Sequence, residues 1–297
     1  MSSSRLSVPA SCLFGAALCG CTGEDIAVAS ASPTTTSTTW TDSDEGSSEE
    51  EEETGLLPKL DIFVDTSQDW LLHFPPENVA SDLWQMVQIK LDDGIVSHQC
   101  FVANTQAAPW PTSSTFTRDD RLMVSNGYSL WEVSLPDCVG TKIADYPKAQ
   151  LGINGIAPDE ENGLYGVSAA SNSLLSINPD TGSLTPVGEL SILLSGSHGA
   201  TWVEEEQQLY LIEGVADTLF RLDPTTAAIE EVTMVDYDFQ IVGFEYHPHN
   251  DRMYGCSSEA LIIEIGPEGT TDPLAALNFP CNNLAAPWGD PELPNTD

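Results

Sequence analysis

The chain has 297 residues, 41% of them hydrophobic, and a formal net charge of −37 at pH 7. Eight of its nine Lys and Arg residues fall in 59–297, so the part that is rich in core-forming side chains is strongly acidic as well. A field of this sign repels nucleic-acid phosphates and anionic lipid surfaces. We therefore expect no nucleic-acid partner.

Residues 1–20 have the layout of a signal peptide. Arg5 supplies one positive charge, Leu13–Leu18 forms a short apolar core, and small residues follow it. The apolar stretch is too short to span a bilayer as a permanent helix. This segment predicts export of the protein.

The end of this segment, Leu18-Cys19-Gly20-Cys21, resembles the bacterial lipobox, in which a small residue precedes the cysteine that is lipidated. The resemblance implies that Cys21 becomes the acylated N-terminus and that several acyl chains anchor the protein stably. It also implies a place in the cell envelope, at the outer membrane or cell surface of a Gram-negative bacterium. Cys19 is unusual at the penultimate place, and ordinary signal cleavage is the alternative.

Residues 21–58 follow as an acidic tether. Most of this stretch is Ser, Thr, Asp and Glu, including the run Glu49–Glu53. Such a composition cannot bury enough apolar surface to offset the entropy of ordering, and like charges extend the chain. We expect a disordered spacer; binding of Ca²⁺ or of a basic partner is the alternative.

Residues 59–297 form the expected folded domain, in which a unit recurs. Its marker tyrosines, Tyr165, Tyr210 and Tyr254, are 45 and 44 residues apart, and Met123 lies 42 residues before the first of them. Each tyrosine follows a hydrophobic stretch that ends in an acidic or polar turn. Alternating residues and Asx-Pro turns such as Asn178–Gly182 come after it.

A period in the forties, made of short strands and turns, predicts an all-β, β-propeller-like repeat domain with four strands per blade. The length allows about five blades, of which one need not be complete. Leu83–Leu91 and Ile95–Val102 read as the back half of the first blade. Its front strands would come from Leu60–Val64 or from the C-terminus, which would close the ring. An open or differently arranged all-β sandwich is the alternative.

The string Leu-Tyr-Gly-Val, followed by Leu-x-x-Ile-Asn-Pro-Asp-Thr-Gly-x-Leu over 164–184, resembles the blades of secreted bacterial quinoprotein-like and NHL-like propellers of unassigned function. The resemblance covers about 113–279. It implies an architecture and says little about activity, because such blades carry many unrelated functions. No cofactor-binding residue can be carried over, and we expect no cofactor.

Four cysteines lie in the domain: Cys100, Cys138, Cys256 and Cys281. They allow three connectivities, and an oxidising compartment favours disulfides. Proximity along the chain favours Cys100–Cys138 and Cys256–Cys281, each linking a terminal blade to its neighbour. Free buried thiols are the alternative. No C-x-x-C pair occurs among the four, so they do not suggest a zinc site.

Candidate chemistry elsewhere is sparse. His247-Pro248-His249 could offer two imidazoles, but Pro248 and Asn250-Asp251 predict an exposed turn without a third ligand. We expect no metal site there.

His198 could line the axial channel or be structural, and Ser195-Gly-Ser-His198 holds a nucleophile and a base without a Gly-x-Ser-x-Gly elbow. The acidic turns Asp159–Glu161 and Glu204–Glu206 lack the alternating spacing of a Ca²⁺ loop. We therefore expect solvated turns, no catalytic residue and no enzyme activity.

The sequence thus favours a cell-envelope lipoprotein that displays a non-catalytic propeller for interaction with a protein or a glycan. One alternative is a degenerate enzyme-type propeller that binds a small ligand or Ca²⁺ in its axial channel. Another is a passive surface scaffold. Polar residues converging on one mouth of the ring would favour the small-ligand alternative, and a flat exposed apolar patch would favour interaction with a macromolecule.

Overall fold

The computed structural model describes residues 69–76, 82–91, 94, 96–135 and 137–289. The expected signal peptide, the lipidation site Cys21, the tether and the candidate strand Leu60–Val64 all lie outside these ranges. Within them, the chain is almost entirely β-structure, with one short 3₁₀ turn, η1 (Lys148–Gln150). No helix among the described residues is long and apolar enough to cross a bilayer.

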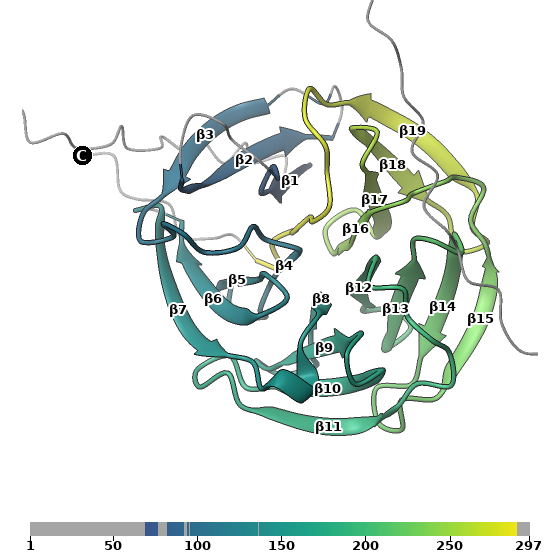
Figure 1. The fold of residues 1–297 in the computed structure, drawn as a ribbon. Coiled ribbons are helices and arrows are strands. Elements are labelled where there is room, and N and C mark those ends of the chain that lie inside the picture. The colour runs from purple at the N-terminus through teal and green to yellow at the C-terminus, as the bar shows by residue number, and fades with distance from the viewer. Residues whose placement is uncertain (1–68, 77–81, 92–93, 95, 136, 290–297) are drawn as a thin grey trace, which may run out of the picture. The chain divides into compact units, whose positions relative to one another are not determined.

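Five antiparallel sheets stand around a common axis as the blades of a propeller (Figure 1). Blade 1 has three strands: β1 (Trp70–His73), β2 (Trp84–Lys90) and β3 (Val96–Val102). Blade 2 comprises β4 (Ser113–Phe116), β5 (Leu122–Ser125), β6 (Ser129–Ser134) and β7 (Val139–Asp145). Blade 3 comprises β8 (Ile153–Pro158), β9 (Leu164–Ser168), β10 (Ser173–Ile177) and β11 (Leu184–Glu189).

Blade 4 comprises β12 (His198–Val203), β13 (Gln208–Glu213), β14 (Thr218–Leu222) and β15 (Ile229–Met234). Blade 5 comprises β16 (Val242–His247), β17 (Arg252–Ser257), β18 (Leu261–Ile265) and β19 (Thr271–Ala276). The expected propeller of about five blades is therefore confirmed. The marker tyrosines lie at one repeated position, on the second strand of blades 3, 4 and 5.

The innermost strands run in the same direction and pack closely because the repeat supplies glycine where they meet. A Cβ atom on Gly155 would lie 2.9 Å from the Ala200 backbone nitrogen, and one on Gly199 would lie 3.0 Å from that of Phe244. Gly243 has the same role toward Asn283. Any side chain here would push neighbouring blades apart, so these glycines set the width of the ring.

The ring closes through the C-terminus. The closing segment, Cys281–Gly289, passes from the outer edge beside β19 to the interior, next to β1 (Figure 1). Ala285 and Leu72 exchange two backbone hydrogen bonds of 2.9 and 3.0 Å in antiparallel register. The segment therefore takes the innermost position of blade 1. The C-terminal part of the chain, one of the two expected sources of front strands, thus supplies the innermost one. The second front strand is β1, which the sequence patterns did not indicate.

Both expected disulfides are present. Cys100–Cys138 joins β3 of blade 1 to the turn before β7 of blade 2. Cys256–Cys281 joins β17 of blade 5 to the start of the closing segment. The two bonds therefore connect blade 1, through its outer strand and its innermost segment, to the blades on either side.

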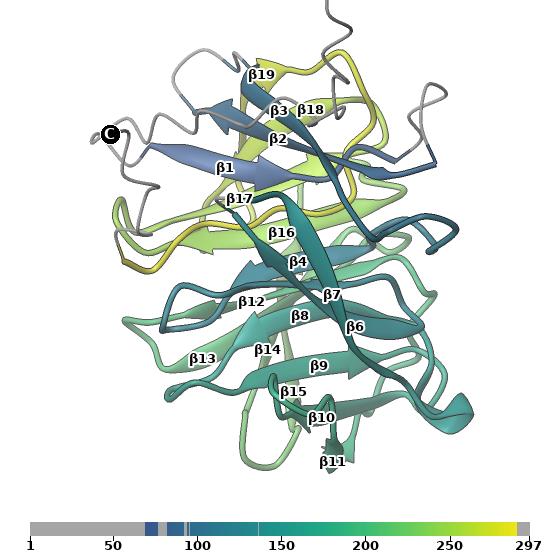
Figure 2. The same cartoon turned by 90° about the vertical axis from the view of Figure 1, so that its left-hand side faces the viewer.

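The ring has two sides, a loop side and a turn side, and Figure 2 shows it from the edge. The loop side carries the connections from the outer strand of one blade to the innermost strand of the next, together with the turns between second and third strands. The turn side carries the turns between first and second strands and between third and fourth strands. The innermost strands run from the loop side to the turn side.

Candidate functional site

The ring axis is filled by side chains at mid-height. Thr115 of β4, Thr201 of β12 and Glu245 of β16 are each completely buried, and the Thr115 hydroxyl lies 3.4 Å from Glu245 Oε1. Strand register places all three at one position of the repeat, opposite Met123, Tyr210 and Tyr254. Glu245 therefore stands where two other blades carry threonine, and it crosses the axis to reach blade 2.

Among the described residues, no charged side chain lies beside the Glu245 carboxyl group. Its Oε2 atom has no hydrogen-bond partner among the described residues. Burial raises its pKa well above the usual range, and hydrogen bonds from the two threonines only partly oppose this. The direction of the shift follows from the lower cost of burying a neutral carboxyl group than a carboxylate.

Aromatic side chains close the turn side of the axis. Trp288 of the closing segment packs against three of the apolar clusters of the domain and lies 6.2 Å from the Tyr246 ring. The guanidinium of Arg118 covers the Trp288 ring at 3.8 Å from its centroid. Arg118 also forms an ion pair with Glu204 and donates to the Asp159 carbonyl at 3.0 Å. Trp288 and Arg118 thus join elements of several blades on the turn side.

The histidines and acidic turns named from the sequence have structural partners. His198 is buried and its Nε2 lies 3.0 Å from the Val167 carbonyl of the preceding blade. His247 is also buried, at the end of β16, with Nε2 3.2 Å from the Trp70 carbonyl; the expectation of an exposed pair was wrong for this residue, because β16 extends to it. His249 alone is exposed.

The Ser195–His198 pair and the acidic turns show no site geometry. Ser195 donates its hydroxyl to Glu213, while His198 bonds the backbone of blade 3, so the two side chains have different partners. Asp159 accepts the amides of Glu161 and Gly163 at 2.8 and 2.7 Å, as an Asx turn does. Among the described residues no group of three or more His, Cys, Asp or Glu could hold a metal ion.

The loop side presents aliphatic side chains to solvent. Leu193 is 89% exposed, Met234 69%, Val215 67% and Ile241 48%. Leu193, Val215 and Ile241 lie in connections and turns around blade 4, and Met234 is the last residue of β15. We call these four residues the blade 4 platform. Tyr128, which is 56% exposed, lies on the same side over blade 2. Five of the six large hydrophobic side chains that are exposed in the described part of the chain thus lie on one side of the ring.

A network of polar side chains fixes the loop 190–197 that carries Leu193. The Asn172 amide nitrogen donates to the carbonyls of Leu190 and Ile192 at 2.9 and 2.6 Å, and its oxygen accepts the Leu194 amide. The Asn154 side chain donates to the Gly196 carbonyl at 2.7 Å. Both asparagines belong to blade 3, so the loop is held from the blade that precedes it.

Glu213, at the end of β13, holds the same loop from blade 4. Its buried carboxylate accepts the Ser195 amide at 3.0 Å and the Ser195 hydroxyl. Its other oxygen accepts the amides of Val215 and Ala216 at 3.1 and 2.7 Å. One carboxylate therefore fixes both the Leu193 loop and the turn that carries Val215, so these two parts of the platform are pre-organised.

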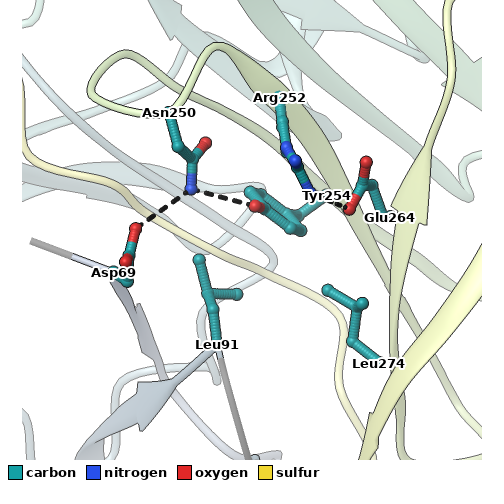
Figure 3. Close-up of a pocket in the computed structure, with 7 residues that line it drawn as sticks. All are labelled: Asp69, Leu91, Asn250, Arg252, Tyr254, Glu264 and Leu274. Carbon is teal, nitrogen blue, oxygen red and sulfur yellow. Dashed lines mark hydrogen bonds and ion pairs between the residues drawn. The ribbon is translucent and has the colours of Figure 1, made fainter.

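A pocket, which we call the seam pocket, lies between blade 5 and blade 1 on the turn side. It has a volume of about 340 Å³ and is lined by Asp69, Leu91, Asn250, Arg252, Tyr254, Glu264 and Leu274 (Figure 3). Another polar pocket of about 380 Å³ lies within blade 3, between the 159–163 turn and the 178–183 turn. The repeat pattern does not indicate the seam pocket, because only ring closure brings Asp69 and Leu91 beside blade 5.

Comparison with known proteins identifies the architecture. No family model matches the sequence, and no curated protein is similar to it. Among solved structures, one in a nidogen/laminin complex aligns over 73% of this chain and 81% of its own, with a TM-score of 0.53 and 11% identity. At this identity, the likeness shows the fold alone.

Two further structures are more distant. A protein of unknown function from Bacteroides thetaiotaomicron aligns over 72% of this chain at 13% identity, with a TM-score of 0.49, and this chain covers 64% of its length. Virginiamycin B lyase from Staphylococcus aureus aligns over 70% of each chain at 13% identity, with a TM-score of 0.42. The chain is a five-bladed β-propeller of a kind that these comparisons do not assign to a function.

Proposed function

We propose that this protein is an envelope lipoprotein that displays a non-catalytic propeller, and that its blade 4 platform binds a protein partner. The observation that carries the proposal is Leu193, an 89% exposed leucine on a loop held by Asn154, Asn172 and Glu213. Rigid apolar anchors of this kind lose little entropy on binding and dominate the energy of protein interfaces.

The chemistry of the platform favours a protein over a glycan. Its side chains are Leu, Val, Met and Ile, which fit an apolar pocket but offer neither an aromatic face nor a polar group to a sugar ring. The net charge of −37 favours a partner whose apolar pocket has Lys and Arg around it. We therefore expect a partner with a basic rim, and association that weakens as salt concentration rises.

The test places a photo-crosslinking amino acid at position 193 in the full-length protein expressed in its own cells. A matched position is Thr185, which is exposed on β11, at the outer edge of blade 3. We expect one protein to be crosslinked from position 193 and not from 185. Crosslinking of the same species from both positions would contradict the proposal.

The crosslinked protein is then purified, and its affinity is measured directly. Leu193→Asp is expected to weaken binding at least tenfold, because it places a charge in an apolar pocket, whereas Thr185→Asp adds the same charge elsewhere. Equal affinities for the two variants would overturn the assignment of the platform.

Anchoring at Cys21 is the second part of the proposal and needs its own measurement. Intact mass of the protein extracted from membranes is expected to fit a chain that starts at Cys21 and carries acyl groups. The mass before and after reduction and alkylation also counts the thiols that are free. A chain that begins elsewhere without lipid would remove the anchor and leave the platform proposal standing.

A further inference from the structure

The seam pocket is assembled from two ends of the described chain. Asp69 and Leu91 come from blade 1, where the Leu91 amide donates to the Asp69 carbonyl at 3.0 Å across the end of the β1–β2 pair. In blade 5, Asn250 lies in the turn between β16 and β17, and Arg252 and Tyr254 lie on β17. Glu264 and Leu274 lie on the outer strands β18 and β19. The pocket therefore exists only when the ring is closed.

The polar side chains of the pocket are pre-arranged. The Asn250 amide nitrogen lies 2.9 Å from the Tyr254 hydroxyl oxygen and 3.5 Å from Asp69 Oδ1 (Figure 3). Arg252 pairs with Glu264 at 2.7 Å, so these two opposite charges compensate each other. Asp69 is exposed, and Asn250, at 3.5 Å, is the one hydrogen-bond partner of its carboxylate among the described residues. The lining thus carries two carboxylates, Glu264 and Asp69, against one cation, Arg252, on which both of them act.

Carboxylates outnumber cations around Tyr254. Burial and the Glu264 carboxylate raise the pKa of Tyr254 to about 12; Asn250 and Arg252 act in the opposite direction, and Asp69 adds to the rise. An anionic ligand would also meet the field of a chain with net charge −37. Leu91 and Leu274 provide apolar surface within the same space (Figure 3).

We propose that the seam pocket binds a small organic cation, in which a primary ammonium group is carried on a short aliphatic chain. The ammonium would pair with Asp69 and donate to it, while the aliphatic chain contacts Leu91 and Leu274. A volume of about 340 Å³ is within the range of small-molecule sites. This site lies on the opposite side of the ring from the blade 4 platform and is independent of it.

The proposal is tested on the full-length protein with three probes: 1-aminopentane, 1-pentanol and glucose. Ligand-detected NMR or calorimetry at pH 7 and low salt gives each affinity. We expect 1-aminopentane to bind at least tenfold more tightly than 1-pentanol, which has the same chain without the charge. Tighter binding of glucose, or equal binding of the alcohol, would overturn the proposed ligand class.

Variants separate this site from general attraction to an acidic protein. Asp69→Asn is expected to weaken 1-aminopentane binding at least fivefold, and the backbone hydrogen bond to Leu91 does not need the carboxylate, so the fold should persist. Glu268→Gln removes an equal charge from an exposed turn of blade 5 and should leave binding unchanged. An equal effect of the two substitutions would show counterion attraction only and would refute the site.

A further pair of variants tests the apolar wall and the independence from the platform. Leu274→Asn should reduce the advantage of longer alkylamines over shorter ones, because Leu274 contacts the chain and not the ammonium. Leu193→Asp should leave amine binding unchanged. Loss of amine binding in Leu193→Asp would place the ligand on the platform and overturn the seam assignment.

Discussion

Blade 4 and blade 1 have similar sheets but are held together by different means. Blade 4 is formed by four consecutive strands joined by short turns, and its neighbours along the chain flank it on both sides. Blade 1 has three consecutive strands and receives its innermost segment from the other end of the domain. The loop that must be closed to form blade 1 is therefore nearly the whole domain, and loop closure costs entropy.

The extra interactions at the seam offset this cost. His73 Nδ1 lies 2.8 Å from the Asn283 carbonyl, and Asn283 uses its amide side chain to bond the Phe74 backbone at 2.8 and 2.9 Å. A disulfide fixes Cys281 just before these contacts. The seam between blades 5 and 1 thus has a disulfide and buried polar contacts where chain connectivity is missing.

The largest effect is expected from removal of the closing segment. A chain that ends at Pro280 loses the Ala285–Leu72 pair, the Asn283 contacts and Trp288, which leaves an open edge and exposed apolar surface on blades 1 and 5. We expect it to fail to fold as a monomer, measured by circular dichroism and size-exclusion chromatography. A chain that ends at Gly289 keeps all these contacts and is the matched control; a cooperative unfolding transition in the shorter chain would refute the closure model.

The disulfides rank next. Loop entropy alone predicts a loss of about 3.5 kcal/mol without Cys256–Cys281 and about 4 kcal/mol without Cys100–Cys138, whose loop is longer. In denaturant unfolding we expect the opposite order of stability loss. The variant with Cys256→Ala and Cys281→Ala should lose more stability than the variant with Cys100→Ala and Cys138→Ala, because only the Cys256–Cys281 bond holds the closing segment. If the Cys100–Cys138 variant loses more stability, the seam is no weaker than the rest of the ring.

Acid should weaken the seam through His73. Burial lowers its pKa from 6.5 to about 4, so its contribution is fully present above pH 6.5 and is lost as pH falls toward 4. The full loss corresponds to about 3 kcal/mol. Unfolding by urea at pH 7 and pH 4.5 should show a smaller difference for His73→Gln than for the wild type. His249→Gln, at an exposed position, should behave like the wild type.

Glu245 should produce a smaller change of the opposite sign. Its raised pKa means that the folded state binds the proton more tightly than the unfolded state, so stability falls as pH rises above the ordinary range of a glutamate. Glu245→Gln should therefore stabilise the protein at pH 8, by about 1 kcal/mol or more, and leave it unchanged at pH 4. Destabilisation at pH 8 would show that the carboxylate has a ligand or partner on the axis.

The smallest stability effect belongs to the blade 4 platform. Leu193→Asp should change the free energy of unfolding by less than about 0.5 kcal/mol, because the side chain is 89% exposed. Glu213→Ala should destabilise the protein clearly more, since it removes the acceptor that the amides of Ser195, Val215 and Ala216 share. A large loss in Leu193→Asp would mean that the leucine is part of the core and not an interaction anchor.

Much of this architecture was predictable from the sequence because a repeat carries the same local signals in each copy. Tyrosines spaced by 45 and 44 residues and Asx-Pro turns such as Asn178–Gly182 predicted the blades, and spacing along the chain predicted both disulfides. Alternating residues and turns are properties of a few neighbouring positions, so no long-range contact is needed to recognise them.

The sites needed the tertiary structure. In the sequence, Glu245 looks like an ordinary strand residue, and only the closed ring places it against Thr115 and Thr201. Leu193 looks like an ordinary core residue, and only the structure shows that its loop exposes it to solvent. The seam pocket joins Asp69 to Tyr254, 185 positions further along the chain. Sequence alone determined the repeating unit, because the same local chemistry recurs in each copy. Only closure of the ring decided which side chains outside the repeat pattern meet, because such contacts depend on distance in space and not on spacing along the chain.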